Sequence, residues 1–141
     1  MKNLETKITE WFLRISLSTS LLSAVGDRLG IWSKEHSSWG NWESFLTYTQ
    51  KLNPFVLPSL IPLLGGFATF LEIVFALSLL ATYKTEYFAK ATGILLLLFG
   101  LAMTFTLSIK APLDYSVFIG SAAAFSLSIL VKKQQPANVS V

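Results

Sequence analysis

Residues 60–80 read LIPLLGGFATFLEIVFALSLL, an apolar run in which the carboxylate of Glu72 is the one ionisable side chain. A run of this length is long enough to cross about 30 Å of hydrocarbon as an α-helix. An ionised carboxylate at that depth is costly unless it is neutralised, paired or turned towards a cavity. The stretch therefore predicts a membrane helix, and the surroundings of Glu72 become the main functional question.

The rest of the chain repeats this apolar pattern. Hydrophobic residues make up 52% of the 141 residues, and charged residues make up 13%, about half the share in a typical soluble domain. Apolar stretches lie at Ile8–Val25, Ser59–Ala81, Phe88–Leu107 and Leu113–Val131. Since backbone in hydrocarbon must satisfy its hydrogen bonds internally, such uninterrupted runs are expected to be helices.

We therefore predict an all-α membrane protein, a four-transmembrane-helix antiparallel bundle with a short interfacial helix between helices one and two. The spans are expected over about 8–28, 59–82, 88–108 and 113–132. They form a single membrane domain over 1–133, because the polar connections are too short to fold alone. A polar tail over 134–141 is expected to be disordered.

The first connection is long and rich in tryptophan, with Trp32, Trp39 and Trp42 in it. Indole rings prefer the headgroup level of a bilayer, so this segment is expected to lie along the membrane interface. Asn41 is a suitable N-cap for an amphipathic helix over about 42–52, which Asn53 and Pro54 would end. Two interpretations stay open for this helix: an interfacial anchor, which we favour, or a lid over an outward-facing pocket.

Basic residues predict how the chain is oriented in the membrane. With four spans, both termini and the second connection share one side. That side holds Lys2, Lys7, Lys84, Lys90, Lys132 and Lys133, and the other holds Arg28, Lys34, Lys51 and Lys110. The excess of basic residues on the side of the termini predicts a multi-pass protein with both termini in the cytoplasm. This topology explains the net charge of +3, and no basic run points to nucleic acid.

Several kinds of chemistry are excluded by composition. The chain has no cysteine, so it cannot supply thiolate metal ligands, iron–sulfur ligands or a thiol–disulfide couple. His36 is its one histidine, and metal-ligand spacing is absent, so no metal site is expected. We expect no covalently bound cofactor.

Charged residues near the spans give two candidate sites. Arg14 and Glu72 are estimated to lie at similar depth and form a candidate intramembrane ion pair. Arg14, however, lies opposite a stripe of Ser16, Ser20, Ser23 and Asp27 that is expected to mark the packing face. If Arg14 instead extends to the headgroups, Glu72 is expected to be protonated.

The second candidate site lies at the outer end of the bundle. Asp27 and Arg28 close the first span, and Lys110 and Asp114 flank the third connection. These four charges form either a network at the mouth of the bundle or ordinary interfacial charge. The three tryptophans Trp32, Trp39 and Trp42 are candidate walls for a ligand there.

Two strings in the chain are similar to a known family. SAVGDRLGIW at 23–32, followed by WGNWESFLTYTQKLNPF at 39–55, resembles the DoxX-like family of small bacterial membrane proteins. Arg14, Glu72 and KAPLDYSVF at 110–118 also resemble that family. The resemblance implies a four-helix bundle in the bacterial inner (plasma) membrane, and it places an outer site at Asp27, Arg28 and residues 39–42.

What the resemblance implies about function is broader. Some relatives are small subunits of a thiosulfate:quinone oxidoreductase, others belong to stress-related membrane complexes, and others act in assembly. We expect an accessory, oxidoreductase-associated subunit that contacts the bilayer and holds a quinone or another small apolar ligand. A homo-oligomer or a soluble redox partner is expected, and whether the chain is catalytic stays open. The alternatives are a membrane assembly or chaperone factor, or a small proton-coupled transporter that uses Glu72.

Overall fold

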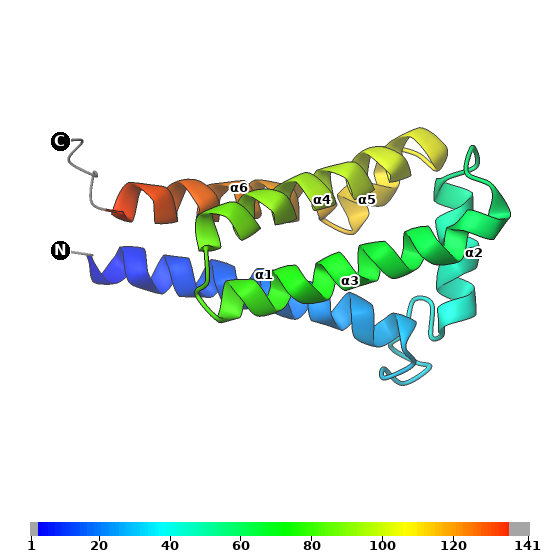
Figure 1. The fold of residues 1–141 in the computed structure, drawn as a ribbon, viewed down its shortest axis with the longest axis horizontal. Coiled ribbons are helices and arrows are strands. Elements are labelled where there is room, and N and C mark those ends of the chain that lie inside the picture. Colours follow the sequence, from blue (N-terminus) through cyan, green and yellow to red (C-terminus); the bar gives the residue numbers. More distant parts are fainter. Residues whose placement is uncertain (1–2, 136–141) are drawn as a thin grey trace.

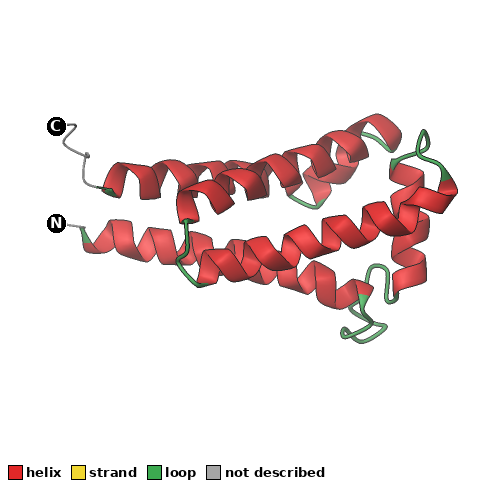
Figure 2. Ribbon diagram, in the orientation of Figure 1, coloured by secondary structure: helices red, strands yellow, loops and turns green. Residues whose placement is uncertain are grey.

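The computed structural model describes residues 3–135, and all regular elements in that range are helices (Figures 1 and 2). They are α1 (Leu4–Arg28), α2 (Trp42–Leu52), the short 3-10 helix η1 (Pro58–Leu60), α3 (Ile61–Leu80), α4 (Thr85–Thr106), α5 (Lys110–Asp114) and α6 (Val117–Gln134). The predicted all-α class is confirmed. A helix is also present at the predicted residues 42–52, and its N-cap Asn41 accepts the Ser44 N–H at 2.8 Å.

Four long helices run along the molecule, and α2 lies across one end of them (Figure 1). Both termini and the α3–α4 connection lie at the opposite end. The helix α1 packs on α3 and α6, while α4 packs on α3 and most extensively on α6. We refer below to the α2 end and the terminal end of the bundle.

Three helical segments within residues 3–135 are long and apolar enough to cross a membrane: Pro58–Leu80, Thr85–Thr106 and Val117–Gln134. The helix α1 is longer than any of them but carries several charges, including Glu10, Arg14 and Arg28. These three charged residues are buried inside the bundle. The structure thus supports a multi-pass membrane protein with three candidate spans.

Two helices begin at other residues than the spans predicted there. The first helix begins at Leu4 rather than near residue 8, because Asn3 caps it by accepting the Glu5 N–H at 3.3 Å. The fourth span begins at Val117 rather than 113, because Ser116 has a left-handed backbone with φ of 56° and separates α5 from α6. The predicted tail also starts too early, since α6 runs to Gln134; residues 136–141 lie outside the described range.

Small residues allow α4 and α6 to approach closely. A Cβ added to Gly93 would lie 3.0 Å from the ring of Phe125, and one added to Gly100 would lie 2.7 Å from the ring of Phe118. Neither position has room for a methyl group. The two aromatic rings of α6 therefore pack directly on the backbone of α4, as in other membrane helix pairs.

The expected packing face of α1 is wrong for most of its length. Ser20 and Ser23 are exposed, Ser16 is half-buried and Asp27 is buried, whereas Leu17, Leu21 and Ser18 on the other side are buried. The Ser18 hydroxyl donates to the carbonyl of Ala76 in α3 at 3.0 Å. The leucine row buries more apolar surface than the serine stripe could, so α1 turns its serines outward.

Candidate functional site

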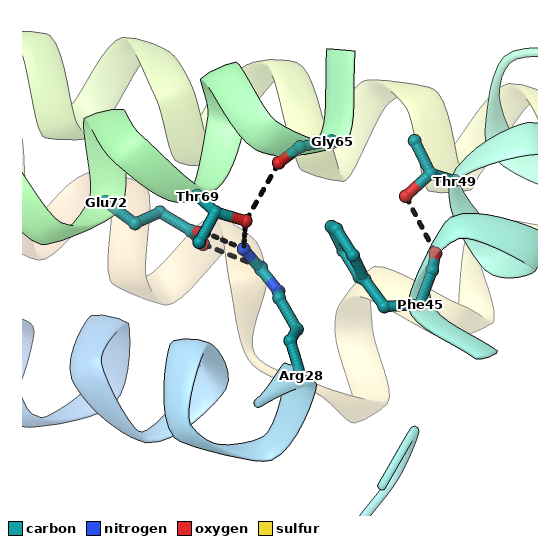
Figure 3. A network of polar contacts seen from close by, with 6 residues as sticks. All are labelled: Arg28, Phe45, Thr49, Gly65, Thr69 and Glu72. Carbon is teal, nitrogen blue, oxygen red and sulfur yellow. Dashed lines mark hydrogen bonds and ion pairs between the residues drawn. The ribbon is translucent and has the colours of Figure 1, made fainter. Parts of the chain in front are cut away.

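The carboxylate of Glu72 is bound by Arg28 at the last turn of α1 (Figure 3). Both carboxylate oxygens are used: Nη2 donates to Oε1 at 3.0 Å, and Nη1 donates to Oε2. Nη1 also donates to the Thr69 hydroxyl at 2.8 Å, which itself donates to the Gly65 carbonyl at 2.8 Å. Arg28 is 4% exposed and Glu72 is 2% exposed, so the pair is inside the bundle.

Aromatic rings from α2 and the preceding loop cover this pair. The Phe45 ring centroid lies 4.1 Å from the Arg28 guanidinium carbon, and the Trp39 centroid lies 5.3 Å from it. Figure 3 shows Phe45 directed from α2 towards the guanidinium. The Nε–H of Arg28 has no hydrogen-bond acceptor among residues 3–135. The helix α2 thus covers the ion pair with a ring that attracts cations.

The predicted pair between Arg14 and Glu72 is wrong. Arg14 binds Glu10 one turn earlier in α1, through Nε at 3.0 Å. It also donates from Nη1 to the Leu79 carbonyl at 2.8 Å and to the Thr85 hydroxyl at 2.7 Å. Extension to the headgroups is wrong too, because Arg14 is 4% exposed.

The reason is the register of α1 against α3. Hydrogen bonds place Ser18 beside Ala76 and Arg14 beside Leu79, at the last turn of α3. The depth estimate assumed that the two helices cover the same levels. In fact α1 extends past α3 towards the terminal end, so its last residue, Arg28, is the one that reaches Glu72 (Figure 1).

Asp27, the neighbour of Arg28, organises the loop that follows α1. Its Oδ2 accepts the N–H groups of Ser38 at 2.8 Å and Trp39 at 3.2 Å, and its Oδ1 accepts the Gly40 N–H at 3.0 Å. Gly30 and Gly40 have φ of 73° and 77°, which only glycine adopts readily. Asp27 therefore folds the loop back and brings Trp39 over Arg28.

An open groove of about 760 Å³ lies between α1 and this loop. The hydroxylated side of α1 and the loop line it together, through Thr19, Ser20, Ser23, Ala24, Asp27, Trp32, His36, Ser38 and Trp39. The Trp32 indole is held in place because its Nε1–H donates to the Ser23 carbonyl at 3.1 Å. The groove offers indole rings, hydroxyl groups, an imidazole and a carboxylate to a ligand.

The predicted outer site is only partly brought together. Asp27, Trp32 and Trp39 line the groove, and Arg28 lies behind Trp39. The predicted four-charge network does not form, because Lys110 and Asp114 bind each other on the exposed surface of α5. Sequence reasoning missed Thr69 and Phe45 as neighbours of Arg28, although helical spacing places Thr69 on the Glu72 face and Phe45 on the apolar face of α2.

Trp42 packs in an aromatic cluster of α2 instead of lining the groove. Its ring centroid lies 5.2 Å from that of Phe45, while Trp39 lies 5.3 Å from Phe45 and 5.7 Å from Tyr48. Burial raises the pKa of the Tyr48 phenol above its ordinary value, and the nearby Tyr115 raises it further. The cluster joins α2 to the loop that precedes it.

Metal chemistry gains no support from this arrangement, since residues 3–135 contain no group of three His, Cys, Asp or Glu side chains able to hold an ion. The candidate functional features are therefore the Arg28–Glu72 pair and the groove beside α1.

The chain matches no family model, no curated protein and no solved structure.

Proposed function

We propose that the chain crosses the membrane four times, with α1 as the fourth span beside the three apolar helices. The two arginines of α1, Arg14 and Arg28, are each paired with a carboxylate inside the bundle. The face that α1 turns outward near the terminal end is apolar, with Ile8 61% and Phe12 71% exposed. Such a helix can contact lipid while it buries its charges against protein.

The orientation proposed from the basic residues places both termini in the cytoplasm of a bacterium and the α2 end outside. Membership in the DoxX-like family is part of this proposal. It is supported by the buried Glu72, by the folded segment after Asp27 and by the helix over Trp42–Leu52.

The function that these contacts support best is that of a non-catalytic accessory subunit with a ligand groove at its outer end. The observation that carries it is the enclosure of Glu72, whose two carboxylate oxygens are both bound by Arg28. A proton-coupled transporter needs a carboxylate that exchanges protons with a pathway. Glu72 does not line the groove, so a structural role for Glu72 is better supported than transport.

The groove would hold a small amphipathic ligand, with Trp32 and Trp39 as walls and the α1 hydroxyls as hydrogen-bond partners. A quinone is the ligand that the resemblance suggests. The reaction would belong to a redox partner, soluble or in the membrane, or the chain would act as a homo-oligomer.

Mild solubilisation followed by mass spectrometry of bound lipids, quinones and proteins tests this function. Ser20→Phe fills the groove, whereas Ser126→Phe makes the same change on an exposed face of α6 and serves as the control. We expect the unmodified chain and Ser126→Phe to retain a ligand or partner that Ser20→Phe loses. The proposal fails if all three proteins are purified without either.

The four-span topology has its own test, because the chain contains no cysteine and accepts single reporters. We expect an impermeant maleimide to label Ser33→Cys in intact cells, and to label Asn3→Cys and Tyr83→Cys only after permeabilisation. If Asn3→Cys is labelled together with Ser33→Cys in intact cells, α1 does not cross the membrane.

A further inference from the structure

We propose that the groove beside α1 binds the organic ammonium group of a membrane amphiphile. This inference rests on the proposed function, since it names the chemical class of the ligand in the same groove. It starts from Asp27, a buried carboxylate in the groove lining that forms no ion pair with any residue from 3 to 135.

Asp27 has one hydrogen-bonding position left for a ligand. A carboxylate has about four acceptor positions. Three are used by the N–H groups of Ser38, Trp39 and Gly40, two of them on Oδ2 and one on Oδ1. The nearest arginine, Arg28, is committed to Glu72, so the charge of that pair is already balanced. The negative charge of Asp27 therefore lies in the groove lining without a counter-ion among residues 3–135.

The walls of the groove suit a cation as well. Trp32 and Trp39 both line it, and indole is the ring that attracts ammonium groups most strongly. Both rings are held in place, Trp32 by its bond to the Ser23 carbonyl and Trp39 by its packing on Phe45. Rigid aromatic walls beside a carboxylate are the usual way in which proteins recognise quaternary ammonium ions.

The surface next to the groove suits the chain of an amphiphile. Along one face of α1, Ile8, Phe12 and Ile15 are 61%, 71% and 49% exposed. The same face continues at helical spacing into Thr19 and Ser23, which line the groove. An acyl chain would lie on the apolar residues while its headgroup lies in the groove.

Other ligand chemistries fit this lining less well. An anion would meet the Asp27 carboxylate, and a neutral ring such as a quinone would leave that charge without a counter-ion. His36 is the one basic side chain in the lining. The charge of the groove thus favours an ammonium group over an anion or a neutral ring.

Quenching of tryptophan fluorescence by brominated lipids tests the inference on the full chain in bilayers. We expect the chain to bind dibrominated phosphatidylcholine with a binding constant about tenfold higher than that for dibrominated phosphatidylglycerol. Asp27→Asn should reduce the ratio of the two binding constants towards one. Asp114→Asn, which changes an exposed carboxylate on α5, should leave it unchanged.

A second arm distinguishes a lipid headgroup from a free amine. Choline is added as a competitor beside its neutral isostere, 3,3-dimethyl-1-butanol, which has the same shape without the charge. If choline displaces the brominated lipid and its neutral isostere does not, the groove recognises the ammonium group. If choline also binds to the chain in the absence of phosphatidylcholine, a free amine is a source of the bound ammonium group. Equal competition by the two compounds would overturn the inference.

A third variant covers the case in which Asp27→Asn disorders the loop. Trp32→Leu removes an aromatic wall without touching the three bonds of Asp27, and it should also reduce the lipid preference. If neither variant changes the preference, the ammonium site is wrong. Retention of a quinone by the unmodified chain, with no preference for phosphatidylcholine, would overturn this inference and leave the proposed function standing.

Discussion

Arg28 and Glu72 are 44 positions apart in the chain, yet the guanidinium of one binds both carboxylate oxygens of the other inside the bundle. The pair joins the last turn of α1 to the middle of α3, and Phe45 of α2 covers it. Each charge is stable at this depth because the other neutralises it and because Thr69 accepts a further hydrogen bond. The arrangement makes the two residues dependent on each other.

This dependence predicts strong energetic coupling between Arg28 and Glu72. Glu72→Ala should lower the free energy of unfolding by about 3–5 kcal/mol, because it leaves a buried guanidinium without its counter-ion. Arg28→Ala should cost a similar amount. The double substitution should cost less than the sum by about 1–3 kcal/mol, measured by unfolding in detergent.

The exposed pair on α5 provides the control for this cycle. Lys110 and Asp114 are bonded at the surface, so replacing either by alanine should change the free energy of unfolding by less than about 1 kcal/mol. Additive costs for Arg28→Ala and Glu72→Ala would show that the buried pair is not a mutual requirement.

Arg14 is predicted to act independently, at the terminal end of the bundle. It joins three helices through Glu10, the Leu79 carbonyl and the Thr85 hydroxyl. Arg14→Lys should lower the free energy of unfolding by about 1–3 kcal/mol, because an ammonium group cannot reproduce the planar guanidinium fork. Thermal unfolding in detergent measures this loss.

The control is Lys133→Ala in the last turn of α6, at the same end of the bundle, which removes an exposed charge and should cost less than about 1 kcal/mol. The costs of Arg14→Ala and Glu72→Ala should add to within about 0.5 kcal/mol. Coupling well above that value would mean that the two sites communicate through α3.

Much of the helical framework could be predicted from local patterns. The apolar length of residues 60–80 predicts α3, and helical spacing puts Thr69 on the same face as Glu72, which the structure buries. The Asn41 cap could be predicted because capping depends on a side chain and the N–H group three residues later. Features of this kind are decided within one or two turns of chain.

The partner of Glu72 could not be predicted in this way. Its identity depends on how far α1 slides along α3, and that register is decided by packing between distant residues, such as Leu17 against Leu79. The groove could be predicted only in part for the same reason. Asp27, Trp32 and Trp39 were candidates, but the hydrogen bonds that Asp27 accepts from residues 38–40 join positions that no local spacing rule connects.

Two adjacent glycines of α3 give a matched pair of substitutions for the position of α2. A Cβ at Gly65 would lie 2.9 Å from Leu46 and 3.1 Å from Phe45, whereas one at Gly66 would meet nothing within 4 Å. Gly65→Ala should therefore displace α2 and cost about 1–3 kcal/mol, while Gly66→Ala should be neutral or stabilise by up to about 1 kcal/mol.

Unfolding in detergent and the emission spectrum of the tryptophans measure this difference. Displacement of α2 would separate Phe45 from Trp39, which packs on it from the preceding loop, and the greater exposure of Trp39 would shift the emission to longer wavelength. Equal behaviour of the two variants would show that α2 does not depend on close contact at Gly65.

The last prediction concerns the loop that Asp27 holds. Asp27→Ala removes the acceptor of the Ser38, Trp39 and Gly40 N–H groups, so these amides should lose protection from hydrogen exchange by about tenfold or more. Gly40→Ala should have a weaker effect in the same direction. It keeps the acceptor but strains a backbone with φ of 77°, at a cost of about 1–2 kcal/mol. Amides in the middle of α4 serve as the internal reference, because they lie in a helix that Asp27 does not contact. Protection of residues 38–40 that survives Asp27→Ala would mean that packing of Trp39 on Phe45 and Tyr48 holds the loop without the carboxylate.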